Sequence, residues 1–344
     1  VQGSDVAAHS AGVLDIKTTI LPDADALFLT AIDRYGHELW RWTFPVNKLN
    51  QANEVLSPLS NKVTSTETEN ELTVKAKNHT FIFSKKDGQL KGVSVNNRKI
   101  SFANGPRFIG ARRADRSLDQ FYNHDDEKAK EKDRTYSEFP DAAVFTKLDV
   151  KEDGGNLIVT ADYKLGNLDK VQWTINPNGE AVLDYTYNFS GVVDLMGICF
   201  DYPEDQVISK RWLGAGPYRV WQNRIHGTQY DVWENDYNDP IPGETFTYPE
   251  FKGYFGSVSW MNIRTKEGTI SLTNETPDAY IGVYQPRDGR DRLLYTLPES
   301  GISVLNVIPP VRNKVNSTDL CGPSSQPKWV NGPQSGRIIF RFME

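Results

Sequence analysis

The sequence has few of the residues that build metal sites, disulfide frameworks and nucleophilic centres. Its 344 residues include only 2 Cys, Cys199 and Cys321, and 5 His that are scattered along the chain. Two cysteines are too few for a disulfide scaffold or a thiolate zinc site, and the scattered histidines indicate no metal cluster or catalytic triad. We therefore expect no resident metal or cofactor. For the two cysteines, buried free thiols are favoured over a single bridge.

Positive charge and long apolar runs are also lacking. Lys and Arg number 39 against 45 Asp and Glu, which gives a net charge of −6 and an isoelectric point near 5.5. With no basic excess to neutralise phosphates, nucleic acid is not an expected partner. No apolar run approaches the ~18 residues that a membrane-spanning helix needs, so a membrane is not expected either. The first residues, Val-Gln-Gly-Ser, contain no Met and no signal peptide, which suggests a processed chain or a piece of a longer one.

Helical periodicity is almost missing, and alternation of apolar and polar residues takes its place. This period of two is typical of half-buried strands. It occurs at Leu72–Ala76, Phe81–Phe83, Leu90–Val95, Leu157–Tyr163, Val171–Ile175, Leu183–Phe189, Gly268–Leu272 and Ile338–Phe342. Turn sequences separate several of these runs, notably Asp87-Gly88 and Asn176-Pro177-Asn178-Gly179. The sequence therefore predicts an all-β protein of the sandwich kind.

A domain boundary is predicted between residues 46 and 47. Before it, Gly12–Ile20, Ala26–Ile32 and Glu38–Phe44 have the pattern of strands. Two or three strands rarely fold alone, so residues 1–46 are expected to be the tail of a preceding β-sandwich domain or linker strands. Residues 47–344 form the second predicted domain.

Two segments interrupt the alternation. His124–Lys132 is dense in charge and is expected to be a solvated loop or a short exposed helix. Pro203–Pro249 is aromatic, irregular and rich in Gly and Pro. Because long loops inside a compact domain are usually functional, a binding surface is predicted in the second segment.

Two motifs in this chain resemble parts of a known family. The segment Lys210-Arg-Trp-Leu-Gly-Ala-Gly-Pro-Tyr218, running on to Arg224, resembles the Gly-x-Gly-Pro segment in the C-terminal domain of family 2 glycoside hydrolases. The likeness is to the small-chain domain of large β-galactosidases. Upstream, Phe81–Leu90 followed by Gly105-Pro106-Arg107 resembles the opening of that domain. The resemblance covers about residues 50–344 of the numbered chain. It implies a large antiparallel supersandwich similar to galactose mutarotases, preceded by the end of an immunoglobulin-like domain.

The chain also departs from the family pattern. Many members carry a Glu-Asn-Tyr element after Gly-Pro, where this chain has Tyr218-Arg219-Val220-Trp221. An Asp-Asn-Asp element of the family corresponds to a region that holds Arg112-Arg113-Ala-Asp-Arg116 here. Specificity for galactose therefore does not follow from the resemblance, and the identity of the sugar stays open.

The resemblance places catalysis outside this chain. Family 2 enzymes use two glutamates on a (β/α)₈ barrel, and such a barrel needs roughly 250 residues of alternating strands and helices. The sequence has no stretch of that kind, so we expect no catalytic residues and no hydrolytic activity of the chain alone. The expected partners are a carbohydrate and the catalytic barrel of a parent enzyme. A homo-oligomer, a cation in the parent enzyme, and export to the periplasm or the outside of the cell are also compatible with the resemblance.

The candidate substrate-binding residues are aromatic and polar. In the family, a Trp on a loop near the C-terminus stacks on the sugar, and Trp329 is the corresponding residue by position. An indole face suits the apolar C–H side of a pyranose. Trp221 and Trp233, which lie close in sequence to Arg224, His226 and Glu234, form a second candidate set. The simpler alternative for the Trp residues is packing in the core, and for Glu234 a solvated turn.

Other functions fit the same sequence. A stand-alone carbohydrate-binding module would bind glycan and convert nothing. An aldose epimerase would need a His and a carboxylate as acid and base. A polysaccharide lyase would draw on a set such as Asn223, Arg224, His226 and Tyr230, which fall within one short stretch.

Overall fold

The chain divides into two compact units, Val1–Leu56 and Ser57–Glu344. The computed structural model describes residues 6–16, 19, 24–46, 62–113, 136–140, 142–237, 251–286, 297–311 and 323–344. The boundary predicted between residues 46 and 47 falls at the start of a stretch outside these ranges. Its exact position therefore stays a prediction.

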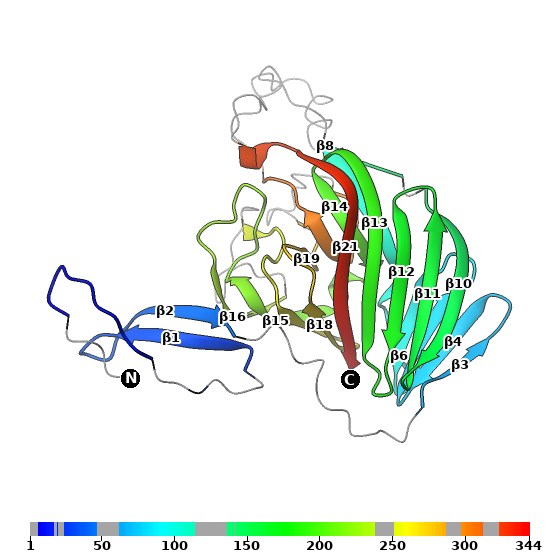
Figure 1. The fold of residues 1–344 in the computed structure, drawn as a ribbon, viewed down its shortest axis with the longest axis horizontal. Coiled ribbons are helices and arrows are strands. Elements are labelled where there is room, and N and C mark those ends of the chain that lie inside the picture. The colour runs from blue at the N-terminus through cyan, green and yellow to red at the C-terminus, as the bar shows by residue number, and fades with distance from the viewer. Residues whose placement is uncertain are drawn as a thin grey trace, which may run out of the picture. The chain divides into compact units, whose positions relative to one another are not determined.

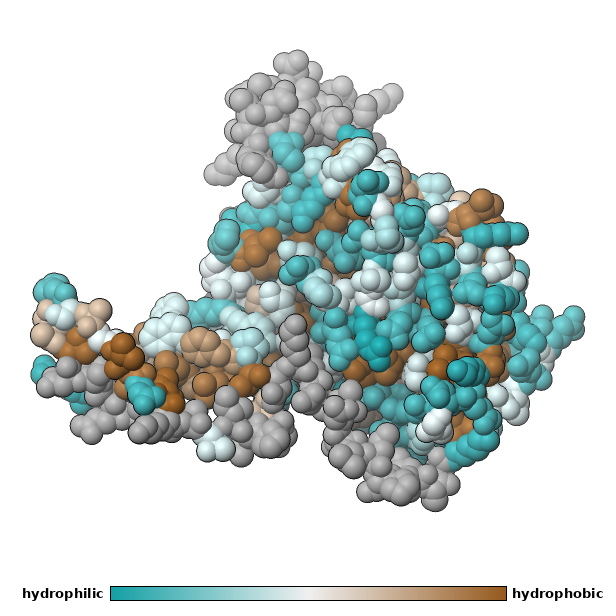
Figure 2. Space-filling view, in the orientation of Figure 1, coloured by the Kyte–Doolittle hydropathy of each residue, from teal (hydrophilic) through white to brown (hydrophobic). Residues whose placement is uncertain are grey.

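The first unit contains a two-stranded antiparallel ribbon of β1 (Ala26–Ile32) and β2 (Glu38–Pro45). The Asp33 carboxylate closes the connecting turn by accepting hydrogen bonds from two main-chain N–H groups, those of Tyr35 and His37. The predicted strand over Gly12–Ile20 is wrong for residues 12–16, which have no strand conformation. Alternation alone does not make a strand, because a strand also needs a hydrogen-bonding neighbour. Hydrophobic side chains gather on this unit (Figure 2).

The second unit is built from two large sheets (Figure 1). In sheet order, the nine-stranded sheet consists of β10 (Val144–Asp153), β11 (Asn156–Lys164), β12 (Leu168–Ile175), β13 (Ala181–Val193), β21 (Lys328–Met343), β18 (Gly268–Asn274), β17 (Trp260–Thr265), β15 (Val207–Gly216) and β16 (Gln229–Asp236).

The ten-stranded sheet has one main path and two side strands. Its path runs through β19 (Tyr280–Gly282), β20 (Ile302–Val307), β14 (Leu195–Asp201), β8 (Ala103–Arg113), β6 (Leu90–Val95), β5 (His79–Ser84), β4 (Glu71–Ala76) and β3 (Thr64–Glu67), with β7 (Arg98–Ile100) on β6 and β9 (Tyr136–Glu138) on β8. Short 3₁₀ turns occur at η2 (Glu204–Gln206) and η5 (Pro323–Ser325). Strand pairs throughout the described ranges are antiparallel, which confirms the predicted all-β, antiparallel fold class.

Two hairpins predicted from turn sequences are confirmed. Strands β5 and β6 pair across the turn at Asp87-Gly88, where Gly88 has a φ of +73° that favours glycine. Strands β12 and β13 pair across the turn that ends at Gly179, which has a φ of +93° and donates its N–H to the Asn176 carbonyl at 3.0 Å.

The core lies between the two sheets and is rich in aromatic rings. Phe102 and Phe200 belong to the ten-stranded side, and Trp173 and Phe340 to the nine-stranded side. The ring centroids of Phe102 and Phe200 are 4.5 Å apart, and Phe340 lies 5.1 Å from Phe102. Each of these side chains is at most 1% exposed. Burial of rings of this size is the main source of stability for the sandwich.

The two Gly-Pro pairs of the resemblance motifs occupy tight places in this fold. A Cβ atom at Gly105 would lie 2.4 Å from Cδ1 of Phe200, and one at Gly216 would lie 2.4 Å from Cδ1 of Trp233. Only glycine fits such contacts without displacing an aromatic ring. Both Gly-Pro bonds are cis.

The aromatic segment Pro203–Pro249 is more regular than predicted. It contains β15 and β16, two paired strands of the nine-stranded sheet, so the prediction of an irregular loop is wrong for these residues. Strand β15 is buried on both faces along most of its length, which hides the alternation that marks a half-buried strand. Residues 238–250 and the charged run His124–Lys132 lie outside the described residues.

Cys199 lies on β14 as a buried free thiol, 2% exposed. Burial raises its pKa, against the opposing effect of the Arg107 guanidinium, whose Nη2 lies 3.7 Å from the Cys199 Sγ. Cys321 lies outside the described residues, so its state stays a prediction.

Candidate functional site

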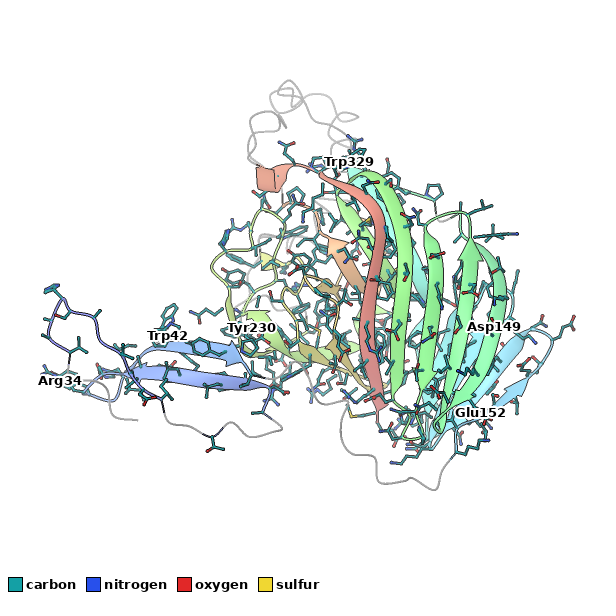
Figure 3. The ribbon with its side chains drawn as sticks, viewed as in Figure 1. Arg34, Trp42, Asp149, Glu152, Tyr230 and Trp329 are labelled. Carbon is teal, nitrogen blue, oxygen red and sulfur yellow. The ribbon has the colours of Figure 1, made fainter. Side chains whose placement is uncertain are left out.

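Trp329 is a highly exposed aromatic residue at the start of β21. Trp329 is 72% exposed (Figure 3), and Val192 of β13 lies opposite it in the sheet. Exposed polar residues surround this position along the two strands: Lys328 precedes it, and Asn331 accepts a hydrogen bond from Ser190 at 2.9 Å. An exposed indole beside polar groups can stack on a sugar while its neighbours bind hydroxyls.

A buried amide holds the segment that leads to Trp329. The Nε2 of Gln222 donates to the Gln326 carbonyl at 2.8 Å, three residues before Trp329. Asn223 pairs with Val311 through two hydrogen bonds, from Asn223 Nδ2 to the Val311 carbonyl at 3.1 Å and from Val311 N to Asn223 Oδ1 at 2.8 Å. The sequence reasoning missed Gln222 as a positioning residue, because its role depends on contacts about a hundred residues away.

Trp221, proposed from the sequence as a sugar-binding residue, lies in the core. It is 1% exposed and packs edge-on against Tyr254, with ring centroids 5.8 Å apart. Since neither face of its indole is open, it offers no stacking surface in this conformation. Trp221 is therefore packed in the core, which was the simpler alternative for this residue. It directly precedes Gln222 in the chain.

Arg224 and His226 lie on the surface in the turn before β16. Both are exposed, and the Arg224 guanidinium carbon lies 5.2 Å from the centroid of the Phe251 ring. Tyr218 packs edge-on against the same ring at 4.7 Å and donates its hydroxyl to the His226 carbonyl at 3.4 Å. The two predicted residues therefore share one turn, and the arginine side chain lies against the Phe251 ring.

Trp233 and Glu234 lie next to each other on β16 but on opposite faces of the strand. Trp233 is half-buried, packs over Gly216 and donates its Nε1 to the Gln229 carbonyl at 3.1 Å. Glu234 is exposed, and its Oε2 lies 3.9 Å from Nε of Arg211 across the strand pair. The alternation of β strands prevents these neighbours from acting on one ligand.

The predicted residues do not converge on one point. Figure 3 places Trp329 at one end of β21 and Tyr230, on β16, well away from it. Within the described ranges, no hydrogen bond, ion pair or ring contact joins Trp329 to Arg224, His226 or Trp233. Trp329 is therefore the best-exposed aromatic candidate, separate from the group around β16.

Cations inside the motif segment have a structural role. Arg219 is 2% exposed, and its guanidinium carbon lies 4.9 Å from the Tyr284 ring centroid and 5.9 Å from that of Phe255. Burial lowers the pKa of Arg219 to about 10, so it stays charged at neutral pH. Lys210, 1% exposed, lies 5.2 Å from the same Tyr284 ring. These contacts anchor β15 and the Gly-Pro segment in the core.

Within the part of the chain that the structure describes, no three His, Cys, Asp or Glu residues are grouped so that they could hold a metal ion. The same part contains no helix of sufficient length and apolar character to span a membrane.

Comparison with known proteins gives one family and several similar structures. Residues 75–308 match the family described as "Beta galactosidase small chain". No curated protein matches the chain. Among solved structures, the galactose 1-epimerase from Lactobacillus acidophilus NCFM is similar at 10% identity and a TM-score of 0.41, covering 83% of this chain and 99% of that one.

Two further solved structures are similar at comparably low identity. An aldose epimerase homologue from C. elegans has 8% identity and a TM-score of 0.38, covering 82% of this chain and 99% of that chain. An α-N-acetylgalactosaminidase from Bifidobacterium bifidum has 11% identity and a TM-score of 0.40, with 79% of this chain covered. The match covers 36% of that enzyme, so this chain spans well under half of its length.

Proposed function

Because this chain belongs to the β-galactosidase small-chain family, we propose that it is the C-terminal portion of a β-galactosidase-like glycoside hydrolase. The relationship inferred from the two Gly-Pro motifs is thereby confirmed for the small-chain domain. In the proposed parent enzyme, which belongs to family 2, this chain shapes the carbohydrate site and the domain interfaces. Catalysis resides in a barrel outside the chain.

The family match over residues 75–308 carries this proposal. The sheet pairing supports it, because a (β/α)₈ barrel needs parallel strands joined by helices. The strands paired within the described residues are antiparallel throughout, and such sheets need no helical crossovers. These sheets therefore do not form the barrel on which the two glutamates of the proposed parent enzyme would lie.

Trp329 is the residue proposed to contact the sugar. Its exposure of 72% leaves an indole face open, and the tether from Gln222 to Gln326 limits the movement of its segment. A rigid aromatic surface binds a pyranose at a low cost in conformational entropy. Trp221 is not retained in this role because it is buried, and Arg224, His226, Trp233 and Glu234 remain secondary candidates.

The first unit is proposed to belong to a larger β-sandwich. Trp40, Trp42 and Phe44 alternate along β2 and are 49%, 45% and 48% exposed. Their cross-strand partners are Ala31, Leu29 and Leu27, so one face of the ribbon is apolar. A two-stranded ribbon is at best marginally stable in water, which favours an additional layer over this face.

Hydrolysis of a panel of aryl β-glycosides tests the proposal. The purified chain should show no turnover, and turnover should appear when the chain is joined to the preceding segment of its parent protein. Saturable hydrolysis by the chain alone would overturn the proposal. In the joined enzyme, Trp329→Ala should raise KM by about tenfold, the scale of one lost aromatic contact. Tyr35→Ala, at another exposed aromatic position, serves as the control.

A further inference from the structure

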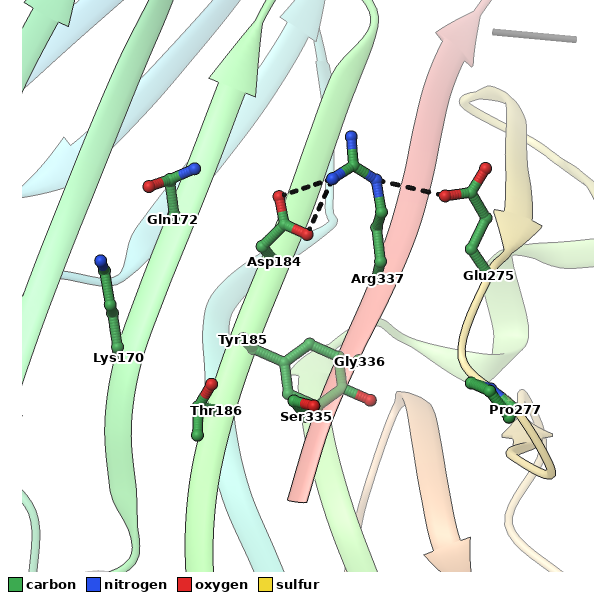
Figure 4. A pocket seen from close by; sticks show the side chains of 10 residues that line it. All are labelled: Lys170, Gln172, Asp184, Tyr185, Thr186, Glu275, Pro277, Ser335, Gly336 and Arg337. Carbon is green, nitrogen blue, oxygen red and sulfur yellow. Dashed lines mark hydrogen bonds and ion pairs between the residues drawn. The ribbon is translucent and has the colours of Figure 1, made fainter. Parts of the chain in front are cut away.

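A shallow groove crosses the outer face of the nine-stranded sheet. Along β12, Val171 and Trp173 point into the core, so the alternating Lys170 and Gln172 lie on the opposite face. The groove has a volume of about 400 Å³, and its polar lining includes Lys170, Gln172, Asp184, Thr186, Glu275 and Arg337 (Figure 4). The face over β12, β13 and β21 is largely hydrophilic (Figure 2).

Arg337 is held firmly at one side of this groove. Its Nη1 lies 3.1 and 3.2 Å from the two carboxylate oxygens of Asp184, and its Nε lies 3.2 Å from Oε2 of Glu275. Strand β18 ends at Asn274, and the turn that follows supplies the partners of the Arg337 backbone. The Arg337 N–H donates to Thr276 Oγ1 at 2.9 Å, and the Glu275 N–H donates to the Arg337 carbonyl at 3.0 Å.

These charged groups remain accessible to a ligand. The side chains of Arg337, Asp184 and Glu275 are 49%, 34% and 32% exposed. Arg337 Nη2 makes no hydrogen bond to any residue that the structure describes. Each carboxylate oxygen can accept more than one hydrogen bond. The groove therefore combines donors and acceptors that are already oriented by contacts with each other.

The charges in the groove balance. Lys170 and Arg337 supply two positive charges, and Asp184 and Glu275 supply two negative charges. An anionic or cationic ligand would meet repulsion as well as attraction. A hydroxyl group suits the site better, because it donates to a carboxylate and accepts from a guanidinium N–H at the same time. Adjacent hydroxyls on one ligand match the adjacent carboxylate and guanidinium groups.

The geometry points to a second carbohydrate-binding site in this groove, which takes a neutral oligosaccharide whose adjacent hydroxyls bridge Arg337 and its two carboxylates. The site is separate from Trp329, which lies eight residues earlier on β21. At about 3.3 Å per strand residue, that spacing is roughly 26 Å, too far for one sugar unit to contact both. The inference goes beyond the proposed function, since it needs neither a barrel nor Trp329.

The expected affinity is low. Tyr185, the aromatic residue of the groove, is 2% exposed and offers no stacking face. Binding by hydrogen bonds exchanged with water gives a small net gain, so a dissociation constant on the order of 1 mM is expected.

Isothermal titration and saturation-transfer NMR of the 344-residue chain test the inference. The probes are a neutral glucan tetrasaccharide and a neutral galactan tetrasaccharide. Arg337→Met removes the guanidinium. Ser335→Leu fills the groove from an exposed position and keeps Arg337, Asp184 and Glu275, so it stays informative if the first variant fails to fold. Arg264→Met, at an exposed arginine of β17 in the same sheet, is the matched control.

We expect saturable binding of at least one probe, weakened about tenfold or more by Ser335→Leu and by Arg337→Met, and unchanged by Arg264→Met. Failure of the wild-type chain to bind either probe would overturn the inference. Binding that Ser335→Leu leaves unchanged would overturn it too. Binding lost only in Trp329→Ala would reject the groove while supporting the proposed role of Trp329, so the two proposals can fail separately.

Discussion

Gln222 donates a hydrogen bond from its side-chain amide to the main-chain carbonyl of Gln326, at 2.8 Å. Gln222 is 7% exposed and follows the core residue Trp221, whereas Gln326 lies three residues before the exposed Trp329. The bond thus links two segments that are far apart in sequence. Through this bond, the buried segment Trp221–Gln222 holds the main chain three residues before the exposed Trp329.

Replacement of Gln222 by leucine should loosen the segment before Trp329. The substitution keeps most of the volume but leaves the Gln326 carbonyl without its donor, at a cost of about 1 kcal/mol in the free energy of unfolding. Hydrogen exchange should speed up at residues 326–330, as measured by mass spectrometry. Gln334→Leu is the control, because it is a half-buried position on β21, the strand that carries Trp329. Unchanged exchange at residues 326–330 would contradict the positioning role of Gln222.

Alanine at Gly216 should destabilise the second unit. Its Cβ would lie 2.4 Å from Cδ1 of Trp233, so the indole must move, at a cost of about 1–3 kcal/mol. Gly92→Ala is the matched control, because a Cβ at Gly92 on β6 meets no atom within 4 Å. Urea unfolding measures both variants. Additional replacement of Trp233 by alanine should relieve the clash, and equal midpoints for the two glycine variants would refute the packing argument.

Phe102→Ala should be among the most damaging core substitutions. Phe102 is fully buried and contacts rings from both sheets, including Phe200 at 4.5 Å and Phe340 at 5.1 Å between centroids. The lost ring and the remaining cavity should cost about 3–5 kcal/mol of unfolding free energy. Phe28→Ala, at a residue 45% exposed in the first unit, should leave unfolding of the second unit unaltered. Chemical denaturation followed by circular dichroism compares the two variants.

Stability should fall at alkaline pH, with Tyr185 contributing. Burial raises the pKa of Tyr185 to about 12. An unfolded chain releases the same proton near pH 10, so between about pH 10 and 12 the unfolded state binds fewer protons and gains relative stability. The contribution of Tyr185 is complete below pH 10, and on the order of 3 kcal/mol is lost as pH rises through 12. Burial also raises the pKa of Tyr187 and of Tyr254, in the same direction.

The alkaline effect is measured as the urea midpoint against pH. Tyr185→Phe removes the titrating hydroxyl, so its curve should be flatter than that of the wild type between pH 10 and 12. Tyr35→Phe, at a residue 69% exposed, is the control and should follow the wild-type curve. If the Tyr185→Phe curve also follows the wild-type curve, Tyr185 has the same pKa in the folded and unfolded states, and the prediction is wrong.

Much of the strand pattern could be predicted from local sequence. The alternation at Leu72–Ala76 and Leu157–Tyr163 marks β4 and β11, because each of these strands has one face in the core and one toward solvent. The Gly88 and Gly179 turns were also predictable, since their positive φ values favour glycine. Where alternation fails as a guide, burial explains the failure: β15 is covered on both faces and its residues do not alternate.

The candidate site was less predictable. Trp221 and Trp329 look alike in sequence, each within a segment of turn-forming and polar residues, yet they are 1% and 72% exposed. The outer-face groove escaped prediction for a similar reason. Asp184 and Arg337 are 153 residues apart, and each is an ordinary polar position on a strand. Only the pairing of β13 with β21 brings them together.

The sequence by itself determined the all-β class, the hairpin turns and the kinship with small-chain domains, because these depend on local alternation, glycine geometry and short motifs. The tertiary structure decided which aromatic residues face solvent and which polar residues share a surface. Those outcomes depend on the pairing of strands that are distant in the chain, and that pairing is selected by burial of the whole core rather than by any one segment.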